Sequence, residues 1–219
     1  IGTELMLLGR PDPAIDVGDA PHLHNDIGRF NEVSVVARRD RPGRDVLAEL
    51  AEVVDERRAS LRATTDADFD AESFTPAGKD TYGRFMQIRV FDCWIHEQDC
   101  RAALDLPGHD AGPAVEVTLD EMTTAMGFVV GKKAGATEGQ SVRLRLTGAT
   151  ARTIDVRVDG RAQVVDDLAE PTTTVTLPTL LWVRLAAGRR PGDPSHPDVT
   201  IEGDEALGRA VIENAAYTI

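Results

Sequence analysis

The sequence predicts an α+β protein in which a bundle of long helices is followed by a small α+β domain with a mostly antiparallel sheet. Up to about residue 133, apolar residues recur at the three- and four-residue spacing of amphipathic helices. At Gly135–Gly139 the period changes to two, and residues 142–146 alternate between aliphatic and charged side chains. We therefore expect a helical domain over residues 1–135 and an α+β domain over residues 140–219.

The first half is expected to be helical almost throughout. Residues 1–8 have helical spacing but no N-cap side chain, so we expect the sequence to begin inside a helix, with the N-terminal helix of the bundle and part of the second lying outside it. In the next two helices the spacing directs Phe30 and Leu50 inward. The further helices are expected over residues 26–38, 44–63, 82–104 and 114–133, with a loop over 69–80 and a break over 107–113.

The second half is expected to form a sheet with two helices. Asp159–Gly160 is a typical hairpin turn between two alternating segments, which makes the neighbouring strands antiparallel. Strands are expected over residues 142–146, 154–158, 162–165, 173–177 and 199–201, and helices over about 178–187 and 204–216.

Composition excludes several classes of protein. A formal net charge of −13 argues against a surface for nucleic acid or an anionic membrane. No apolar run is long enough to span a bilayer. Cys93 and Cys100 are separated by seven residues of one predicted helix, or about 10 Å, which is too far for a disulfide. We expect two buried, reduced thiols in a cytoplasmic protein.

The predicted helix 82–104 carries a polar stripe, which we define as Arg89, Asp92, His96 and Asp99. At about 100° per residue these side chains share one narrow sector with apolar neighbours on both sides. The remaining arc, which includes Trp94, is expected to face solvent. The stripe should therefore point inward, where charges are costly unless they are paired or bound to a metal ion.

The stripe has several possible roles. Asp92 and His96 are four residues apart, so both can reach one zinc ion, but the same spacing also suits a simple ion pair. Asp99 can orient His96 or pair with Arg101 at the surface. Arg89 can bind a substrate carboxylate or neutralise Asp92.

The other candidate residues have plainer interpretations. His22 and His24 lie in a loop that resembles the N-cap region of the next helix. His109 and His196 are expected in solvated turns rich in Pro and Gly. Cys93 has no residue nearby to serve as its base, so we interpret it as part of the core and not as a nucleophile.

Three segments carry a resemblance to a known family. The segment 89–101 resembles the metal-binding helix of the mycothiol-dependent maleylpyruvate isomerase family, and the segment 25–32 also resembles this family. The segment 199–207 resembles the C-terminal domain of that family, which is similar to sterol carrier proteins. The resemblance implies a DinB-like four-helix bundle followed by a sterol-carrier-like α+β domain.

The family resemblance also implies a metal, usually zinc, and mycothiol as cofactors. Its acid-x-x-x-His pair maps onto Asp92 and His96, although the isomerase has Glu at the acidic position. The remaining His ligand would precede Ile1. A metal-bound mycothiol thiolate would add to an electrophilic double bond of a small-molecule substrate, allowing isomerisation, or displace a leaving group. The alternatives are a non-enzymatic protein that binds an apolar ligand in the sterol-carrier-like domain, and a metal-free bundle with an internal ionic network.

Overall fold

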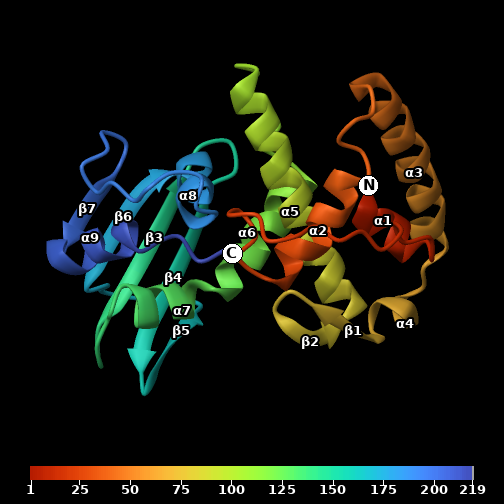
Figure 1. Cartoon of the computed structure of the whole chain (residues 1–219). Coiled ribbons are helices and arrows are strands. Elements are labelled where there is room, and N and C mark those ends of the chain that lie inside the picture. Colours follow the sequence, from red (N-terminus) through yellow and green to blue (C-terminus); the bar gives the residue numbers. More distant parts are fainter. Residues whose placement is uncertain (219) are drawn as a thin grey trace. The chain divides into compact units, whose positions relative to one another are not determined.

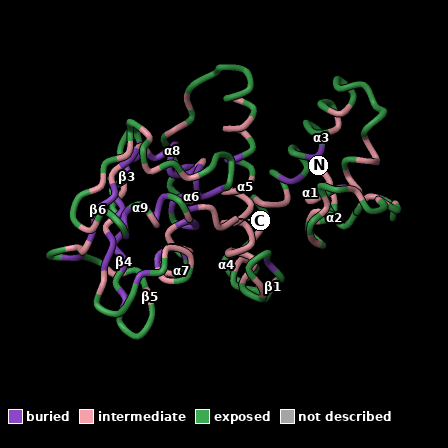
Figure 2. Tube along the Cα trace, turned by 60° about the vertical axis from the view of Figure 1, so that its left-hand side comes forward, coloured by how far each residue is buried: buried purple, intermediate pink, exposed green. Residues whose placement is uncertain are grey.

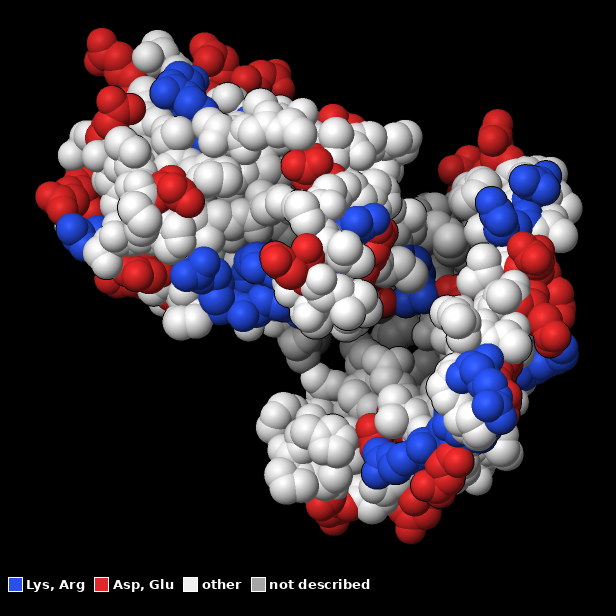
Figure 3. Space-filling model, turned by 90° about the horizontal axis from the view of Figure 1, so that it is seen from above, with Lys and Arg blue, Asp and Glu red and all other residues white. Residues whose placement is uncertain are grey.

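The computed structural model describes residues 1–218, and contacts divide the chain into two compact units, Ile1–Phe85 and Met86–Ile219. Among the described residues, no helix combines the length and the apolar character needed to cross a membrane. Lys and Arg side chains lie among Asp and Glu side chains on the face shown in Figure 3. The formal net charge of −13 comes from the whole sequence.

The first unit contains short and medium helices and one hairpin (Figure 1). Asn25 caps the second helix, since its side chain accepts a hydrogen bond from the backbone N–H of Gly28 at 2.7 Å. The expected loop over 69–80 is wrong in part, because it contains a hairpin that turns at Gly78 with a positive φ of 109°. The elements are α1 (Gly2–Leu7), α2 (Asp26–Val36), α3 (Gly43–Ala63), α4 (Asp66–Phe69), β1 (Glu72–Thr75) and β2 (Gly78–Thr81).

Ionic contacts occupy much of the interior of this unit. Figure 2 shows that most residues of α1, α2 and α3 are only partly buried or exposed. Phe30 and Leu50, which were expected to face inward, are 45% and 38% exposed, so this expectation is wrong for these two residues. The buried residues of these helices are Val53, which was expected to face inward, and the charged residues Glu32 and Arg57. The guanidinium of Arg57 donates to Glu4 at 2.8 Å and to the Tyr82 hydroxyl at 3.0 Å.

The second unit joins helices to a five-stranded sheet. Helix α5 (Tyr82–Ala103) runs into it from the first unit. The expected single helix over 114–133 is divided near Ala125, where the hydroxyls of Thr123 and Thr124 donate to backbone carbonyls of the preceding turn and compete with the helical ladder. The remaining elements are α6 (Pro113–Thr124), α7 (Met126–Phe128), the π-helix η1 (Val129–Lys133), β3 (Ser141–Thr147), β4 (Arg152–Asp159), β5 (Arg161–Val165), β6 (Thr173–Pro178), α8 (Thr179–Ala186), β7 (Thr200–Gly203) and α9 (Glu205–Glu213).

The sheet has the order β5-β4-β3-β6-β7, and only the β3–β6 pair is parallel. Its aliphatic side chains meet α7, η1, α8 and α9, and the largest fully buried side chain, Trp182, comes from α8 (Figure 1). The predicted fold class, a helical region followed by a mostly antiparallel α+β domain, is confirmed. The domain limits, 1–135 and 140–219, stay a prediction, and α6, α7 and η1 share their core with the sheet.

Candidate functional site

Helix α5 carries the polar stripe, and its buried side is defined by Trp94 and Ile95. These side chains are 2% and 5% exposed and belong to the core of the second unit. The indole Nε1 of Trp94 donates to the carbonyl of His109 at 2.9 Å, which attaches the following loop to the helix. The expectation that Trp94 faces solvent is therefore wrong, because a helical wheel does not say which arc finds a packing partner.

The structure brings the four stripe residues into one chain of contacts. Arg89 donates to Asp92 at 2.5 Å. The other oxygen of Asp92 lies 3.4 Å from Nε2 of His96, and Nδ1 of His96 lies 3.4 Å from Asp99. Arg89 is mostly buried, but the side chains of Asp92 and His96 are 46% and 62% exposed, so the imidazole is accessible in the middle of the row. The expectation that the whole stripe points inward is therefore wrong beyond Arg89.

Arg189 completes this row, and no local sequence pattern predicts it. It lies just after α8, and its guanidinium donates to both oxygens of Asp99 at 3.1–3.4 Å. The sequence analysis considered Arg101 as a partner of Asp99, but Arg101 donates to Glu97 at 2.7 Å. The candidate site therefore combines α5 with a segment that comes 90 residues later.

The charges of the row shift the pKa values of its central pair. For Asp92, burial acts to raise the pKa, but the hydrogen bond from His96 and the charges of Arg89 and Arg189 outweigh it, and the pKa lies below its usual value. The hydrogen bond to Asp92 raises the pKa of His96, assisted by Asp99 and opposed by burial and by Arg189. Asp92 is thus held as a carboxylate beside an imidazole, and both groups are metal ligands in other proteins.

The geometry of this pair fits two ligands of one zinc ion. Two ligand atoms at zinc bond lengths in a tetrahedral site lie about 3.3 Å apart, and Nε2 of His96 lies 3.4 Å from Asp92. Residues 1–218 contain no group of three or more His, Cys, Asp or Glu side chains arranged to hold a metal ion. The separation of the two atoms thus fits two of the ligands that a zinc site needs. The third ligand, a His before Ile1, stays a prediction.

Both cysteines depart from their expected positions. Cys93 and Cys100 are exposed, so the prediction of two buried thiols is wrong, while the absence of a disulfide between them agrees with their spacing on α5. The reason is again the direction of the helix, because the core contacts α5 at Trp94 and Ile95.

The remaining histidines are paired more than expected. His22 lies 3.2 Å from Glu32. His109 is not simply solvated, since its Nδ1 lies 2.7 Å from Glu97. His196 is mostly buried and accepts a hydrogen bond from its own turn, so its expected solvation is also wrong.

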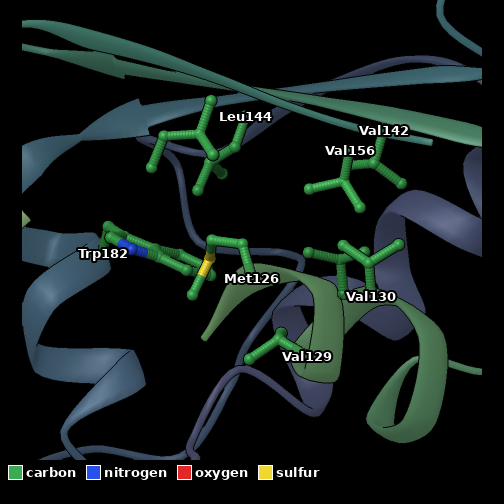
Figure 4. Close-up of a pocket in the computed structure, with 9 residues that line it drawn as sticks. Met126, Val129, Val130, Val142, Leu144, Val156 and Trp182 are labelled. Atoms are coloured by element: carbon green, nitrogen blue, oxygen red, sulfur yellow. The ribbon is translucent and has the colours of Figure 1, made fainter. Parts of the chain in front are cut away.

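A small apolar cavity lies between the sheet and the helices of the second unit. In Figure 4, Leu144 points from the strands toward Met126, and Val156 points toward Val130. The cavity measures about 10 Å³, which is close to the minimum for one water molecule. It is lined by Met126, Val129, Val130, Val142, Leu144, Ile154, Val156, Trp182 and Val211. This space does not favour the alternative of an apolar-ligand carrier.

The fold and the site define a class, an α+β protein in which a helical region with a polar row precedes a mixed-sheet domain. Residues 2–101 match the family model described as the mycothiol maleylpyruvate isomerase N-terminal domain. Residues 116–210 match the model described as the C-terminal domain of the same proteins. The chain belongs to the mycothiol-dependent maleylpyruvate isomerase family, which confirms the resemblance seen in the sequence.

Solved structures give more distant similarities. The crystal structure of the mycothiol-dependent maleylpyruvate isomerase matches with a TM-score of 0.44 and 20% identity over 84% of this chain and 66% of that chain. The structure of its histidine-to-alanine mutant matches with the same TM-score and identity, over 85% of this chain and 68% of that chain. A UbiJ-SCP2 ubiquinone synthesis protein matches with a TM-score of 0.30 and 13% identity, over 42% of this chain and 77% of that chain. No curated protein matches the chain.

Proposed function

We propose that this protein is a mycothiol-dependent enzyme that holds a divalent metal ion, zinc in the first instance, at Asp92 and His96. Its substrate would be a small electrophile, on which the cofactor thiol performs addition and elimination or a transfer reaction. The family to which the chain belongs supports the cofactor. The observation that carries the proposal is the 3.4 Å separation of a carboxylate oxygen and an imidazole nitrogen on one helix face.

The side chains of the polar stripe have distinct roles in this proposal. Asp92 and His96 bind the metal, which when present lowers the pKa of a coordinated thiol so that thiolate exists at neutral pH. Arg89 keeps Asp92 ionised through its 2.5 Å hydrogen bond. Asp99 lies 3.4 Å from the second nitrogen of His96 and in this proposal orients the ring.

Arg189 adds a second cation at the open end of the row. Because Asp99 and Arg189 pair with each other, the guanidinium is fixed near His96. A guanidinium binds carboxylates through two parallel hydrogen bonds. Arg189 is therefore suited to bind an anionic substrate if its N–H groups are divided between the substrate and Asp99. We therefore place Arg189 with the candidate substrate-binding residues.

Elemental analysis of the purified protein and its variants tests the metal site directly. We expect His96→Ala and Asp92→Ala to lower metal content at least about tenfold. Glu97→Gln is the matched control, because Glu97 lies on the same helix but pairs with Arg101 and His109 outside the stripe. The protein should be supplied with its full N-terminal sequence, if one precedes Ile1. Stoichiometric metal in His96→Ala would reject the assignment.

The thiol requirement is tested by turnover of maleylpyruvate with and without mycothiol. Without mycothiol we expect no turnover, and with it we expect activity to survive when Cys93 and Cys100 are both replaced by serine. The reason is that the cofactor supplies the nucleophile, so that no protein thiol is needed. Turnover without the cofactor, or its loss in the Cys93→Ser variant with metal retained, would contradict the mechanism.

A further inference from the structure

A polar groove lies on the sheet face opposite the helices of the second unit. The side chains that alternate with Val142, Leu144 and Leu146 on β3 point away from the core, and this places Arg143 and Arg145 on the outer face. The groove measures about 330 Å³, within the range of sites for small molecules. It is lined by Arg143, Arg145, Thr153, Asp155, Asp166 and Asp167, none of which belongs to the polar stripe.

One wall of the groove is fixed by a nearly buried ion pair. Asp155 is only 3% exposed and receives two hydrogen bonds from Arg143 at 2.8 and 2.6 Å. The same guanidinium donates to Asp167 at 3.0 Å and to the carbonyl of Leu168 at 2.7 Å, while the N–H of Leu168 donates to Asp155 at 3.0 Å. The segment after β5 is thereby held at the rim, and the carboxylate of Asp167 is positioned by Arg143.

Two charged groups of the groove are not used by these contacts. Within residues 1–218, neither Arg145 nor Asp166 forms a hydrogen bond or an ion pair with another side chain. Arg145 lies on the central strand, opposite Thr153 of β4 and Thr176 of β6 in the strand register. Arg145 is two residues along the strand from Arg143, a distance of about 6.6 Å, so the cationic end and the acidic end are separated.

We propose that this groove binds a small zwitterion, with its carboxylate at Arg145 and its ammonium group at Asp166 and Asp167. The charges left unpaired favour a ligand that carries both signs. They are one guanidinium, Arg145, and one carboxylate, Asp166, so a ligand with a single charge pairs with one of them and is repelled by the other. A molecule that carries both charges satisfies both ends. The amino acids and their longer ω-amino homologues are the chemical class that meets this requirement.

Binding is tested by titrating the protein with glycine, β-alanine and 4-aminobutyrate, followed by NMR of backbone amides. Acetate and methylammonium are the single-charge controls. We expect at least one zwitterion to bind about tenfold or more tightly than either control, which corresponds to about 1.4 kcal/mol. The shifted amides should belong to β3, β4 and residues 166–168.

Variants locate the site and keep the test decisive. Arg145→Ala and Asp166→Asn should each weaken binding about tenfold, and both positions are exposed, so the fold should persist. Arg157→Ala is the matched control, because Arg157 is also exposed on the outer face of β4 but does not line the groove. The proposal fails if no zwitterion binds, if acetate or methylammonium binds equally well, or if Arg157→Ala has the same effect as Arg145→Ala. These outcomes do not depend on metal, mycothiol or turnover.

Discussion

Replacing Arg38 with alanine should destabilise the first unit by about 3 kcal/mol at pH 7. The Arg38 side chain is only 10% exposed and donates to Asp12 at 2.9 Å and to Glu49 at 2.7 Å. Without it, the hydroxyl of Ser34 is the one donor that Asp12 keeps among residues 1–218, whereas Glu49 keeps its contact with Arg41 at 2.5 Å. Removing one partner of a buried ion pair costs about 3–5 kcal/mol of the free energy of unfolding. Because Arg41 remains beside Glu49, we expect a cost at the lower end of this range.

The cost should depend on pH with a definite sign. Hydrogen bonds from Arg38 hold the pKa values of Asp12 and Glu49 below their usual values, although burial acts in the opposite direction. A carboxyl group whose pKa is lowered on folding stabilises the protein above its unfolded pKa, about 4, and this stabilisation is lost as the pH falls through the folded pKa. The difference between the wild type and Arg38→Ala should therefore be largest near pH 7 and shrink below about pH 4.

Urea unfolding followed by far-UV circular dichroism at pH 7 and at pH 3 measures this difference, and hydrogen exchange of α2 and α3 peptides at pH 7 locates it. Arg41→Ala is the control, because Arg41 is 42% exposed and a surface pair contributes at most about 1 kcal/mol. Equal losses in the two variants, or a difference that stays constant between pH 7 and pH 3, would refute the reasoning.

Three further substitutions test the second unit. Trp94→Phe should cost about 1 kcal/mol through its lost hydrogen bond, measured by urea unfolding with the fluorescence of Trp182; no loss would contradict the anchoring of the loop. Gly127→Ala should cost about 1–3 kcal/mol in the same assay, because its Cβ would lie 2.6 Å from the carbonyl oxygen of Ala162. Cys100→Ser should change stability by less than about 0.5 kcal/mol, and the native thiol should react with a thiol reagent without denaturant, since Cys100 is exposed; a protected thiol would show that it is buried.

Local patterns predicted most of the secondary structure. Helix α5 was expected over residues 82–104 and extends from Tyr82 to Ala103. Its limits could be predicted because no residue that breaks a helix interrupts this segment. The alternating segments likewise became β3 and β4 in antiparallel register. The hairpin of β1 and β2 was missed, because its two short strands show too little alternation of apolar and polar residues to be recognised.

The candidate site was predictable only as far as one helix determines it. The spacing placed Asp92 and His96 together, and their side chains do lie in contact distance. The same helix gave no information on the direction of its core, so Trp94 and Cys100 were assigned to the wrong environments. Arg189 could not be found, because its contact with Asp99 depends on the tertiary fold and no local pattern records it.

The parallel pairing of β3 with β6 has a consequence for the order in which the sheet assembles. β4 and β5 follow β3 directly and pair through short turns, whereas the second edge of β3 must wait for β6 to be synthesised. During that interval the nascent sheet exposes the backbone of β3 and its aliphatic residues, and such an open edge favours pairing with other chains. The yield of folded protein should therefore depend on how quickly the ribosome delivers residues 173–178.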